Sequence, residues 1–437
     1  MMEPVTLAAL ILLGGLVIGI ALGVPVAVAM GVPSALAIVV LLGWDGAALT
    51  SAQRLFAASN SFALLAIPFF ILAGGLMNTG GIAQRLIDLA QVLAGRLPAS
   101  LAQTTVVANA MFGAVSGASV ASAAAVGSVL SPPMRKAGYD PAFAAAVNAA
   151  ASPAGMLIPP SNTFIIYSLV SSTSVAALFM AGVGPGLLWA LVCIVMVAIY
   201  ARKHPELGGG RRPTAREAGM VFLRAVPSLL MIVIVIGGIL AGFFTATESA
   251  VIAVLYSLAL GLIQKTLPLR ALPSITLEAA KTTAIVMLLI GVSGILAWVM
   301  SFAKVPALVG DALLGLTDNT VVILVIIMII MLLAGTVMDP TPAILIFTPI
   351  FLPIVTELGV DPIHFGTMMV FNMCLGNISP PVGNNLFVAA RVAKVSIEPM
   401  ITRIMPIFWA LTVALFLVAF IPQLSMWLPT VMGLTKP

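Results

Sequence analysis

The chain has 437 residues, of which 61% are hydrophobic, and it carries 19 Lys and Arg against 14 Asp and Glu. A soluble protein of this length would carry on the order of 110 charged residues. Charges this sparse could not cover a surface in water, which excludes a soluble enzyme, a disordered chain and a nucleic-acid-binding protein. Two cysteines, Cys193 and Cys374, lie in separate apolar runs and predict neither a disulfide framework nor a metal site. The composition therefore predicts an all-α, multi-pass membrane protein.

The apolar runs define the expected crossings of the bilayer. Residues 1–30 contain no Lys or Arg, so the basic start of a signal peptide is missing and we expect the first apolar run to remain as a helix. A spanning helix needs about 20 apolar residues. This criterion predicts spans at 5–22, 25–42, 62–78, 140–171, 175–200, 225–243, 248–264, 276–302, 362–392 and 400–420.

Two further apolar stretches, 99–133 and 320–353, have small or polar residues at their centre and end in proline. We interpret them as re-entrant hairpins whose tips, at 113–119 and 335–342, reach the middle of the membrane. Small residues also favour close helix packing, and that alternative explanation is strong for the first stretch. It is weak for the second, where Asp339 and two prolines interrupt the run.

An internal repeat relates the two halves of the chain. Eight residues recur at a separation of 221 positions: Pro132, Gly138, Asp140, Pro141, Gly155, Pro159, Pro160 and Pro185 match Pro353, Gly359, Asp361, Pro362, Gly376, Pro380, Pro381 and Pro406. The first copy carries Arg135 and Lys136 where the second carries only Glu357. Because short basic loops stay in the cytoplasm, the two copies are expected to face opposite sides of the membrane. The repeats would then be inverted, as in many secondary transporters.

Each copy contains a stretch where a helix cannot continue. Residues 152–163 and 372–385 both hold a glycine followed by a double proline, which removes backbone donors and ends a helix. A break at membrane depth survives only if it is buried or lines a wet cavity. A kink that serves packing would explain one such copy, but two copies flanked by polar residues favour a binding site. We therefore expect broken helices at 140–171 and 362–392.

The chemistry of such breaks suits both a cation and an anion. Unwound carbonyls and helix C-termini bind sodium, whereas helix N-termini carry partial positive charge and bind anions. Intramembrane acids are sparse, and Asp339 and Glu248 are the functional candidates, with Glu248 at the expected start of a span. The sequence has no nucleotide-binding glycine loop, so we do not expect ATP hydrolysis within the chain.

The sequence resembles the large membrane subunit of tripartite ATP-independent periplasmic (TRAP) transporters, the DctM-like family. The resemblance covers essentially the whole chain and rests on residues 128–134 (SVLSPPM), 136–140 (KAGYD), 158–161 (IPPS), 178–182 (LFMAG), 185–186 (PG) and 376–383. It implies a permease of the bacterial inner membrane, not an enzyme, that imports a small carboxylate such as a C4-dicarboxylate or sialic acid by sodium symport. It also implies an ion transporter superfamily-like fold and an elevator mechanism, in which a transport domain with both hairpins and both broken helices slides past a scaffold.

The resemblance further implies partners and a division of the chain. The partners are a periplasmic substrate-binding protein (DctP-like) and a small membrane subunit (DctQ-like). We expect the small subunit as a separate polypeptide, because no extra helices precede the first span. The division is 1–60 as N-terminal scaffold, 61–200 as first repeat, 201–224 as cytoplasmic loop, 225–303 as scaffold opening the second repeat, and 304–437 as second-repeat core with C-terminal helices.

Carried onto this chain, the family's sites fall on the breaks and the hairpin tips. Sodium is expected at Ser116, Gly117, Gly155, Gly335, Met338, Pro340 and Gly376. The organic acid is expected at Asn148, Ser161, Asn162, Asn377, Asn384 and Asn385. A stand-alone sodium- or proton-coupled carrier without a binding protein fits the repeats equally well. A membrane enzyme that uses Asp339 or Glu248, or a channel, fits them less well.

Site-directed labelling tests the inverted repeats. Single cysteines placed at Lys136 and Glu357, with Cys193 and Cys374 replaced by serine, should react with an impermeant maleimide from opposite sides of the membrane. Position 136 should react from the cytoplasm and position 357 from the periplasm, and the cysteine-free chain serves as the control. Labelling of both positions from one side would exclude inverted repeats.

Overall fold

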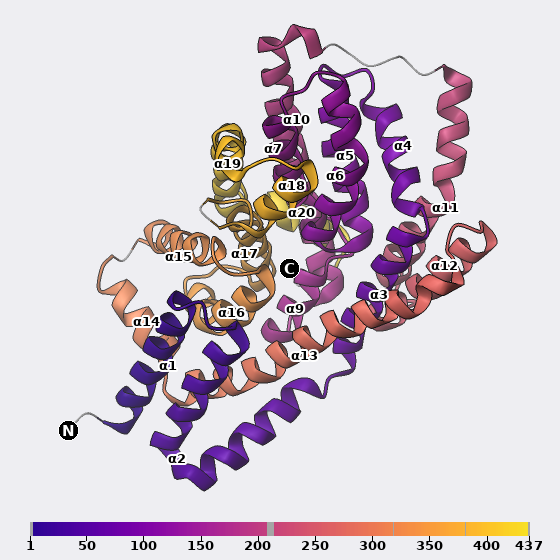
Figure 1. Cartoon of the computed structure of the whole chain (residues 1–437). Coiled ribbons are helices and arrows are strands. Elements are labelled where there is room, and N and C mark those ends of the chain that lie inside the picture. The colour runs from indigo at the N-terminus through magenta and orange to yellow at the C-terminus, as the bar shows by residue number, and fades with distance from the viewer. Residues whose placement is uncertain (1–2, 208–213, 318, 381, 436–437) are drawn as a thin grey trace.

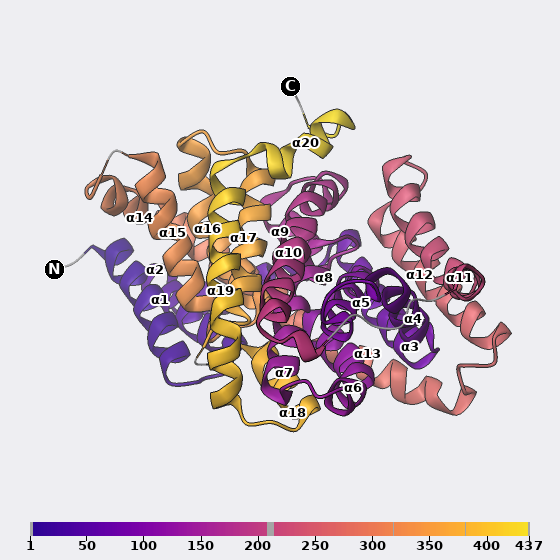
Figure 2. The ribbon, with the colours of Figure 1, turned by 90° about the horizontal axis from the view of Figure 1, so that it is seen from above.

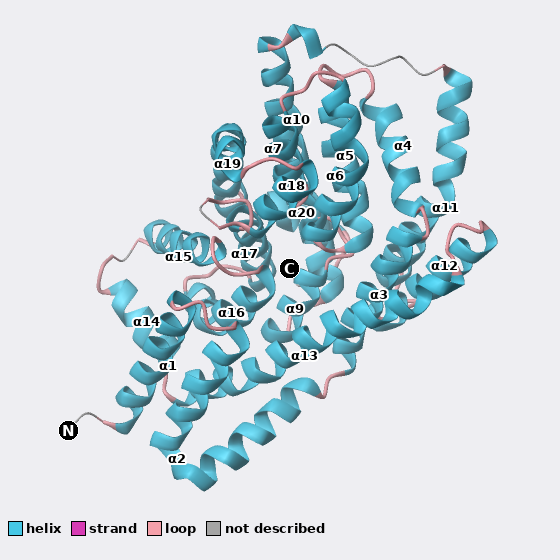
Figure 3. Cartoon of the chain, in the orientation of Figure 1, coloured by secondary structure: helices cyan, strands magenta, loops and turns pink. Residues whose placement is uncertain are grey.

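The computed structural model describes residues 3–207, 214–317, 319–380 and 382–435, and within these ranges the chain forms helices and no strand (Figure 3). The first half contains α1 (Pro4–Ala21), α2 (Val26–Ser59), α3 (Ala66–Thr79), α4 (Ile82–Ala94), α5 (Ser100–Ser116), α6 (Ser119–Lys136), α7 (Pro141–Ala151), α8 (Ala154–Leu157), α9 (Asn162–Ser171) and α10 (Val175–Lys203). The second half contains α11 (Ala215–Leu240), α12 (Ala246–Ile263), α13 (Leu272–Phe302), α14 (Val305–Leu314), α15 (Thr320–Gly335), α16 (Pro340–Glu357), α17 (Pro362–Gly376), α18 (Asn384–Ala393), α19 (Ile397–Phe420) and α20 (Gln423–Val431).

The expected multi-pass architecture is confirmed. Nine helices in the described part of the chain are long and apolar enough to cross a membrane, and the bent pair Pro141–Leu157 and Asn162–Ser171 makes a tenth. Eight of the nine coincide with expected spans, and the ninth is α16, which the sequence predicted as one arm of a hairpin. Hydrophobicity alone does not distinguish such an arm from a span, because both require a long apolar helix.

Two helices extend beyond their expected spans. α2 continues to Ser59 after it changes direction at Gly43, whose φ of 75° is readily adopted only by glycine. α11 begins at Ala215 rather than at 225, because Thr214 and Glu217 form a capping box in which each side chain accepts a hydrogen bond from the other's backbone N–H. The expected loop 201–224 is therefore shorter, and its basic residues Arg211 and Arg212 lie outside the described residues.

Three shorter helices, α4, α14 and α20, were not expected as separate elements. α4 is amphipathic: it buries Ile82, Leu86 and Ala90 at helical spacing and leaves Gln84 exposed. Its polar face gives it too low a hydrophobicity for the span criterion, which explains why the sequence did not indicate it.

The long helices flank a central group that holds both breaks. α13 packs along α2, and the two lie side by side as long rods in Figure 1. The helices α5 to α10 and α15 to α19 pack together beside them, as the view in Figure 2 shows. The residues predicted as the site lie within this central group.

The 221-residue separation also relates whole helices. α6 and α16 begin at Ser119 and Pro340 and end at Lys136 and Glu357, so both boundaries differ by the repeat separation. The two halves exchange partners: α9 packs against α16, and its counterpart α18 packs against α6. Because both contacts cross between the halves, neither half packs as an independent unit.

The contact between α2 and α13 depends on a missing side chain at Gly294. A Cβ atom there would lie 2.4 Å from the Ala58 Cβ and 2.9 Å from the Arg54 carbonyl oxygen. Gly294→Ala should therefore lower the Tm in detergent, through an overpacking cost of about 1–3 kcal/mol. The control is Gly237→Ala, where the added Cβ meets no described atom within 4 Å and should leave the Tm unchanged or raised. Equal Tm values for the two variants would show that α2 and α13 can move apart to accommodate the added methyl group without a loss of stability.

Candidate transport site

The first break lies between α8 and α9. The helices bend by 46° across it, and the Pro159–Pro160 peptide is cis. Two hydroxyls pair the carbonyl that the break sets free: Ser161 Oγ and Thr163 Oγ1 both donate to the Met156 carbonyl oxygen, the latter at 3.2 Å. The interrupted backbone is thus paired inside the protein, as its depth in a membrane protein requires.

The second break lies between α17 and α18, and one of its two prolines, Pro381, is outside the described residues. The Gly383 N–H donates to the Thr336 carbonyl at 3.0 Å, and the Asn385 N–H donates to the Asn377 carbonyl at 3.2 Å. The turn between α15 and α16, which contains Thr336, therefore supplies part of the pairing that the interrupted helix lacks.

In each half, the broken helix touches the preceding helix pair through two glycines. A Cβ on Gly155 would lie 2.1 Å from the Gly113 Cα, and a Cβ on Gly376 would lie 2.7 Å from the Gly335 Cα. Any side chain at these positions would separate α5 from α8, or α15 from α17. The sequence analysis selected three of these glycines as sodium ligands, whereas Gly113 was placed in the predicted hairpin tip 113–119 without a role of its own.

The two breaks meet each other at the centre of the molecule. The Asn377 Nδ2 donates to the Ser119 Oγ, and the Asn385 Nδ2 donates to the Ser152 Oγ, both at 3.0 Å. The Cys374 thiol lies 3.7 Å from the Pro153 carbonyl oxygen, and these two residues are themselves 221 apart. The two segments with the 221-residue spacing therefore touch each other at matching positions.

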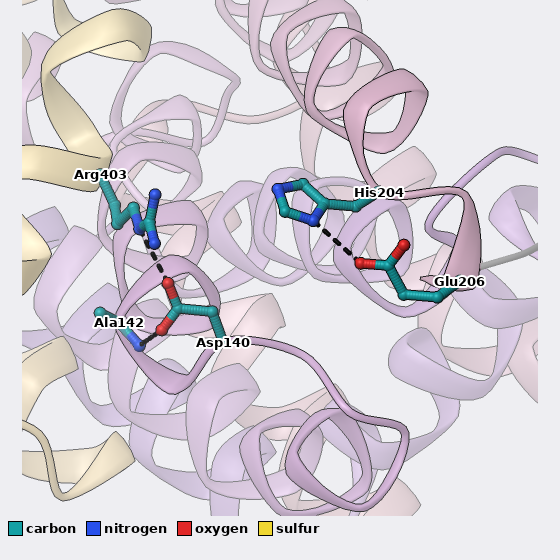
Figure 4. Close-up of polar contacts among 5 residues, drawn as sticks. All are labelled: Asp140, Ala142, His204, Glu206 and Arg403. Carbon is teal, nitrogen blue, oxygen red and sulfur yellow. Dashed lines mark hydrogen bonds and ion pairs between the residues drawn. The ribbon is translucent and has the colours of Figure 1, made fainter.

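The N-termini of α7 and α17 lie beside opposite ends of α19, and both helices run from there towards this centre. The Asp140 carboxylate, which caps α7, accepts a hydrogen bond from the Arg403 Nε at 2.8 Å (Figure 4). His364, in the first turn of α17, lies 3.1 Å from the Ala419 carbonyl oxygen. Between Arg403 and Ala419 α19 rises by about 24 Å at 1.5 Å per residue. The N-termini of α7 and α17 are therefore far apart, while their C-termini meet.

In the described structure, the N-termini of α6, α9, α16 and α18 converge at this centre. A Cβ on Gly117, which precedes α6, would lie 3.3 Å from the backbone nitrogen of Asn162 at the start of α9. At the other pair, the Asn384 Nδ2 of α18 donates to the Asp339 Oδ1, which precedes α16, at 2.7 Å. Asn377 joins the two pairs, because its Nδ2 donates to Ser119 of α6 and its carbonyl accepts from the Asn385 N–H of α18. Helix N-termini present backbone N–H groups and partial positive charge, so their convergence favours an anion.

The same region holds buried oxygen atoms without hydrogen-bond partners. The Oδ1 atoms of Asn372, Asn377 and Asn385 are buried and find no partner among the described residues. Each Nδ2 already donates a hydrogen bond, that of Asn372 to the Met328 carbonyl at 2.9 Å. Rotating an amide to exchange its oxygen and nitrogen would therefore break that bond. A buried polar atom left unpaired costs about 1–3 kcal/mol. Amide oxygens of this kind are suitable ligands for a hard cation or for water.

Asn148, predicted as a substrate ligand, is engaged elsewhere. Its Oδ1 accepts from the Asn109 Nδ2 at 3.0 Å, and its Nδ2 donates to the Ala123 carbonyl at 2.8 Å. The Ser122 Oγ in turn donates to the Asn109 Oδ1 at 2.8 Å. This buried network, which the sequence analysis missed, ties α7 to α5 and α6. The role of Asn148 as a ligand stays a prediction.

The other predicted sodium ligands lie in the two turns that join the helix pairs. Ser116 ends α5, and its Oγ donates to the Ala118 carbonyl at 3.4 Å. Met338 is buried, and Pro340 begins α16. Both turns lie beside the glycine contacts, so the structure places these residues near Gly155 and Gly376. Their role as ligands stays a prediction.

The two acidic candidates have different surroundings. Glu248 completes a capping box at the start of α12, where its Oε2 accepts from the Thr245 N–H at 2.8 Å. Asp339 is hydrogen-bonded to Asn384 at the convergence of helix N-termini. Within the described residues, no group of three or more His, Cys, Asp or Glu side chains could hold a metal ion. Of the two acids, only Asp339 therefore lies at the candidate site.

The contacts of the predicted asparagines were not visible in the sequence. Asn377 and Asn385 were selected as ligands, but their partners Ser119 and Ser152 in the other half were not, nor was Asn372, which contacts the Met328 carbonyl within the second half. The one available signal was their polarity within small or apolar helical runs, because such groups must find partners when they are buried.

The chain matches the family described as Tripartite ATP-independent periplasmic transporter, DctM component, over residues 13–424. The chain belongs to this family. A Salmonella typhimurium protein named YgiK is 49% identical over 422 residues, which cover 96% of this chain and 97% of that protein. The C4-dicarboxylate TRAP transporter large permease protein DctM of Pseudomonas aeruginosa is 39% identical over 400 residues, which cover 91% of this chain and 93% of that protein. The resemblance seen in the sequence is confirmed.

The fold of this DctM component is also similar to that of a solved transporter. The crystal structure of the YdaH transporter of Alcanivorax borkumensis superposes with a TM-score of 0.65 at 15% identity, over 91% of each chain. At this identity the similarity concerns the fold alone. The DctM component is thus a multi-span membrane protein with the fold of a known transporter.

The Asn148 network can be tested separately from binding. Asn148→Ala should remove two buried hydrogen bonds, one with the Asn109 Nδ2, which keeps its bond to the Thr105 carbonyl, and one with the Ala123 carbonyl, at a cost of about 0.5–1.5 kcal/mol each. The Tm should therefore fall in buffer that contains neither sodium nor solute. Asn384→Ala, whose side chain makes one exposed contact, is the control and should change the Tm little. An unchanged Tm combined with weaker solute binding would instead support the role of Asn148 as a ligand.

Proposed function

We propose that this protein is the large permease subunit of a TRAP transporter that uses a sodium gradient to import a small carboxylate. The solute would be a C4-dicarboxylate, sialic acid or a similar organic acid. The observation that carries the proposal is the convergence of helix N-termini from both halves, in a chain of the DctM family. This convergence provides an anion site without requiring an arginine within the membrane.

Sodium coupling is supported by helix ends of the opposite polarity. The last turn of α5 meets the one-turn helix α8 at Gly113 and Gly155, and the C-termini of α15 and α17 meet at Gly335 and Gly376. Carbonyls at a helix C-terminus lack intrahelical partners and carry partial negative charge. Together with the unpaired Asn377 Oδ1, they form a set of neutral oxygen ligands suited to a monovalent cation.

Binding of the carboxylate is assigned to groups at the start of the half-helices. Ser161 and Asn162 stand at the start of α9, and Asn384 and Asn385 at the start of α18. A carboxylate between these helix starts would accept hydrogen bonds from amide and backbone N–H groups. A cation bound nearby would increase its affinity by direct attraction, which couples the binding of the two species.

An elevator motion of inverted repeats is proposed as the transport step. Its support is the contact of Cys374 with its counterpart Pro153, together with the entry of α7 and α17 from opposite ends of α19. The helices that hold the breaks pack on one another, and they would move as one body past α2 and α13. As partners we propose a periplasmic binding protein that delivers the solute and a small membrane subunit in the bacterial inner membrane.

Reconstitution tests this function. The chain and the small subunit should be reconstituted in liposomes with an inward sodium gradient, and the binding protein should be added outside. Uptake is then measured for a panel of radiolabelled solutes that includes C4-dicarboxylates and sialic acid. We expect uptake that requires sodium and the binding protein. Uptake without the binding protein would identify a stand-alone carrier, and uptake that requires ATP would refute both.

Glycine variants test whether the breaks form the site. Gly155→Ala and Gly376→Ala place a Cβ against backbone atoms, so both should reduce sodium-driven uptake by about tenfold or more, an effect of about 1.4 kcal/mol. Gly237→Ala in α11 should transport like the unmodified chain. Variants that fold and transport normally would show that close contact at the breaks is not needed for transport.

A further inference from the structure

A polar cavity lies away from the breaks, between α4 of the first half and α11 and α12 of the second. It has a volume of about 710 Å³, and its charged and amide lining comes from Gln84, Arg85, Asp88, Arg224 and Gln264. α4 packs directly against α11, and the two helices lie beside each other in Figure 1. None of these residues takes part in the candidate transport site.

The polar groups of this cavity are only partly satisfied by the protein. Within the described chain, neither Arg85 nor Arg224 forms an ion pair with a carboxylate. Asp88 accepts one hydrogen bond, from the Gln84 Nε2 at 2.9 Å, and pairs with no described basic side chain. The Gln264 Oε1 is buried and has no described partner. Among the described residues, the cavity thus combines two guanidinium groups that have no carboxylate partner, of which that of Arg224 contacts the Met220 sulfur at 3.8 Å, with the Asp88 carboxylate, which accepts one hydrogen bond, and the Gln264 Oε1, which accepts none.

Exposed apolar side chains border this polar cavity. Leu223, which forms part of its wall, is 70% exposed, and Ile263, next to Gln264 in the chain, is 77% exposed. Both belong to helices long and apolar enough to span the membrane, and exposed apolar side chains on such helices suit contact with lipid chains. The cavity therefore lies where a helix surface meets the headgroup layer, which favours an amphiphilic ligand over a free ion.

We propose that this cavity binds the headgroup of an ethanolamine phospholipid. Arg85 and Arg224 would hold the phosphate by charge-assisted hydrogen bonds, and Asp88 and the Gln264 Oε1 would accept from the primary ammonium. The acyl chains would then lie against Leu223 and Ile263.

The same contacts discriminate between headgroups. Phosphatidylglycerol has no ammonium group, so the Asp88 carboxylate would face an anionic lipid with no cation to compensate its charge. A choline headgroup has no N–H to donate to the Gln264 Oε1, which would remain unpaired. The lipid would also link the start of α4 to α11 and α12, and so would strengthen the contact between the two halves. This proposal does not depend on the proposed transport function.

Binding of short-chain lipids to the purified chain tests the site. Thermal unfolding in detergent should be recorded with the dihexanoyl forms of phosphatidylethanolamine, phosphatidylglycerol and phosphatidylcholine, and with inorganic phosphate. We expect phosphatidylethanolamine to bind about tenfold more tightly than the other two lipids. Inorganic phosphate binding as tightly as the lipid would overturn the proposal in favour of a free-ion site, and equal binding of the three lipids would overturn it as non-specific association.

Variants assign the contacts to individual side chains. Arg85→Gln combined with Arg224→Gln should weaken phosphatidylethanolamine binding by about tenfold or more. Asp88→Asn should remove the preference for it over phosphatidylglycerol. The matched control is Arg270→Gln, an exposed arginine that does not line the cavity, and it should bind like the unmodified chain. If the double variant does not fold, the two single variants replace it, and unchanged binding in both would refute the site.

Discussion

The structure depends on one constraint: backbone that leaves a helix inside an apolar protein must find other hydrogen-bond partners. The two breaks solve this problem by close approach. Glycines without side chains let Gly113 reach Gly155 and Gly335 reach Gly376, and the Thr336 carbonyl pairs with the second break. These contacts join each broken helix to a helix pair. The resulting centre contains helix ends of both polarities, which an unbroken bundle would not provide.

The two halves share their geometry but not their chemistry. In the first break, hydroxyls of Ser161 and Thr163 satisfy the Met156 carbonyl. In the second break, Asn377 and Asn385 reach across to the first half with their Nδ2 atoms and leave their oxygens buried without described partners. The helices before and after the two breaks thus share their spacing along the chain, while the side chains make the two breaks unequal. In the proposed mechanism this inequality allows one pseudo-symmetric centre to bind two different species.

Sequence patterns predicted a large part of the fold and a smaller part of the site. The spans were evident because their apolar runs exceed the length that a bilayer requires, and the breaks were evident because proline ends a helix. The amphipathic helix α4 and the early start of α11 were missed, since both depend on polar residues outside the apolar runs. At the site, Gly155 and Gly376 stood out through the repeat, whereas Gly113 and Asn109 did not. Their importance lies in contacts with residues distant in the sequence.

By itself, the sequence determined that this chain enters a membrane, that its two halves share a 221-residue spacing of prolines and glycines, and that it resembles the DctM-like permeases. These properties follow from hydrophobicity, from proline and glycine positions and from short motifs, all of which act locally along the chain. Only the tertiary structure decided that Asn377 meets Ser119, that Asn148 is engaged with Asn109, and that helix N-termini from both halves converge. The reason is that a hydrogen bond or a helix dipole acts over a few ångströms in space, and the path of the whole chain sets which residues come within that distance.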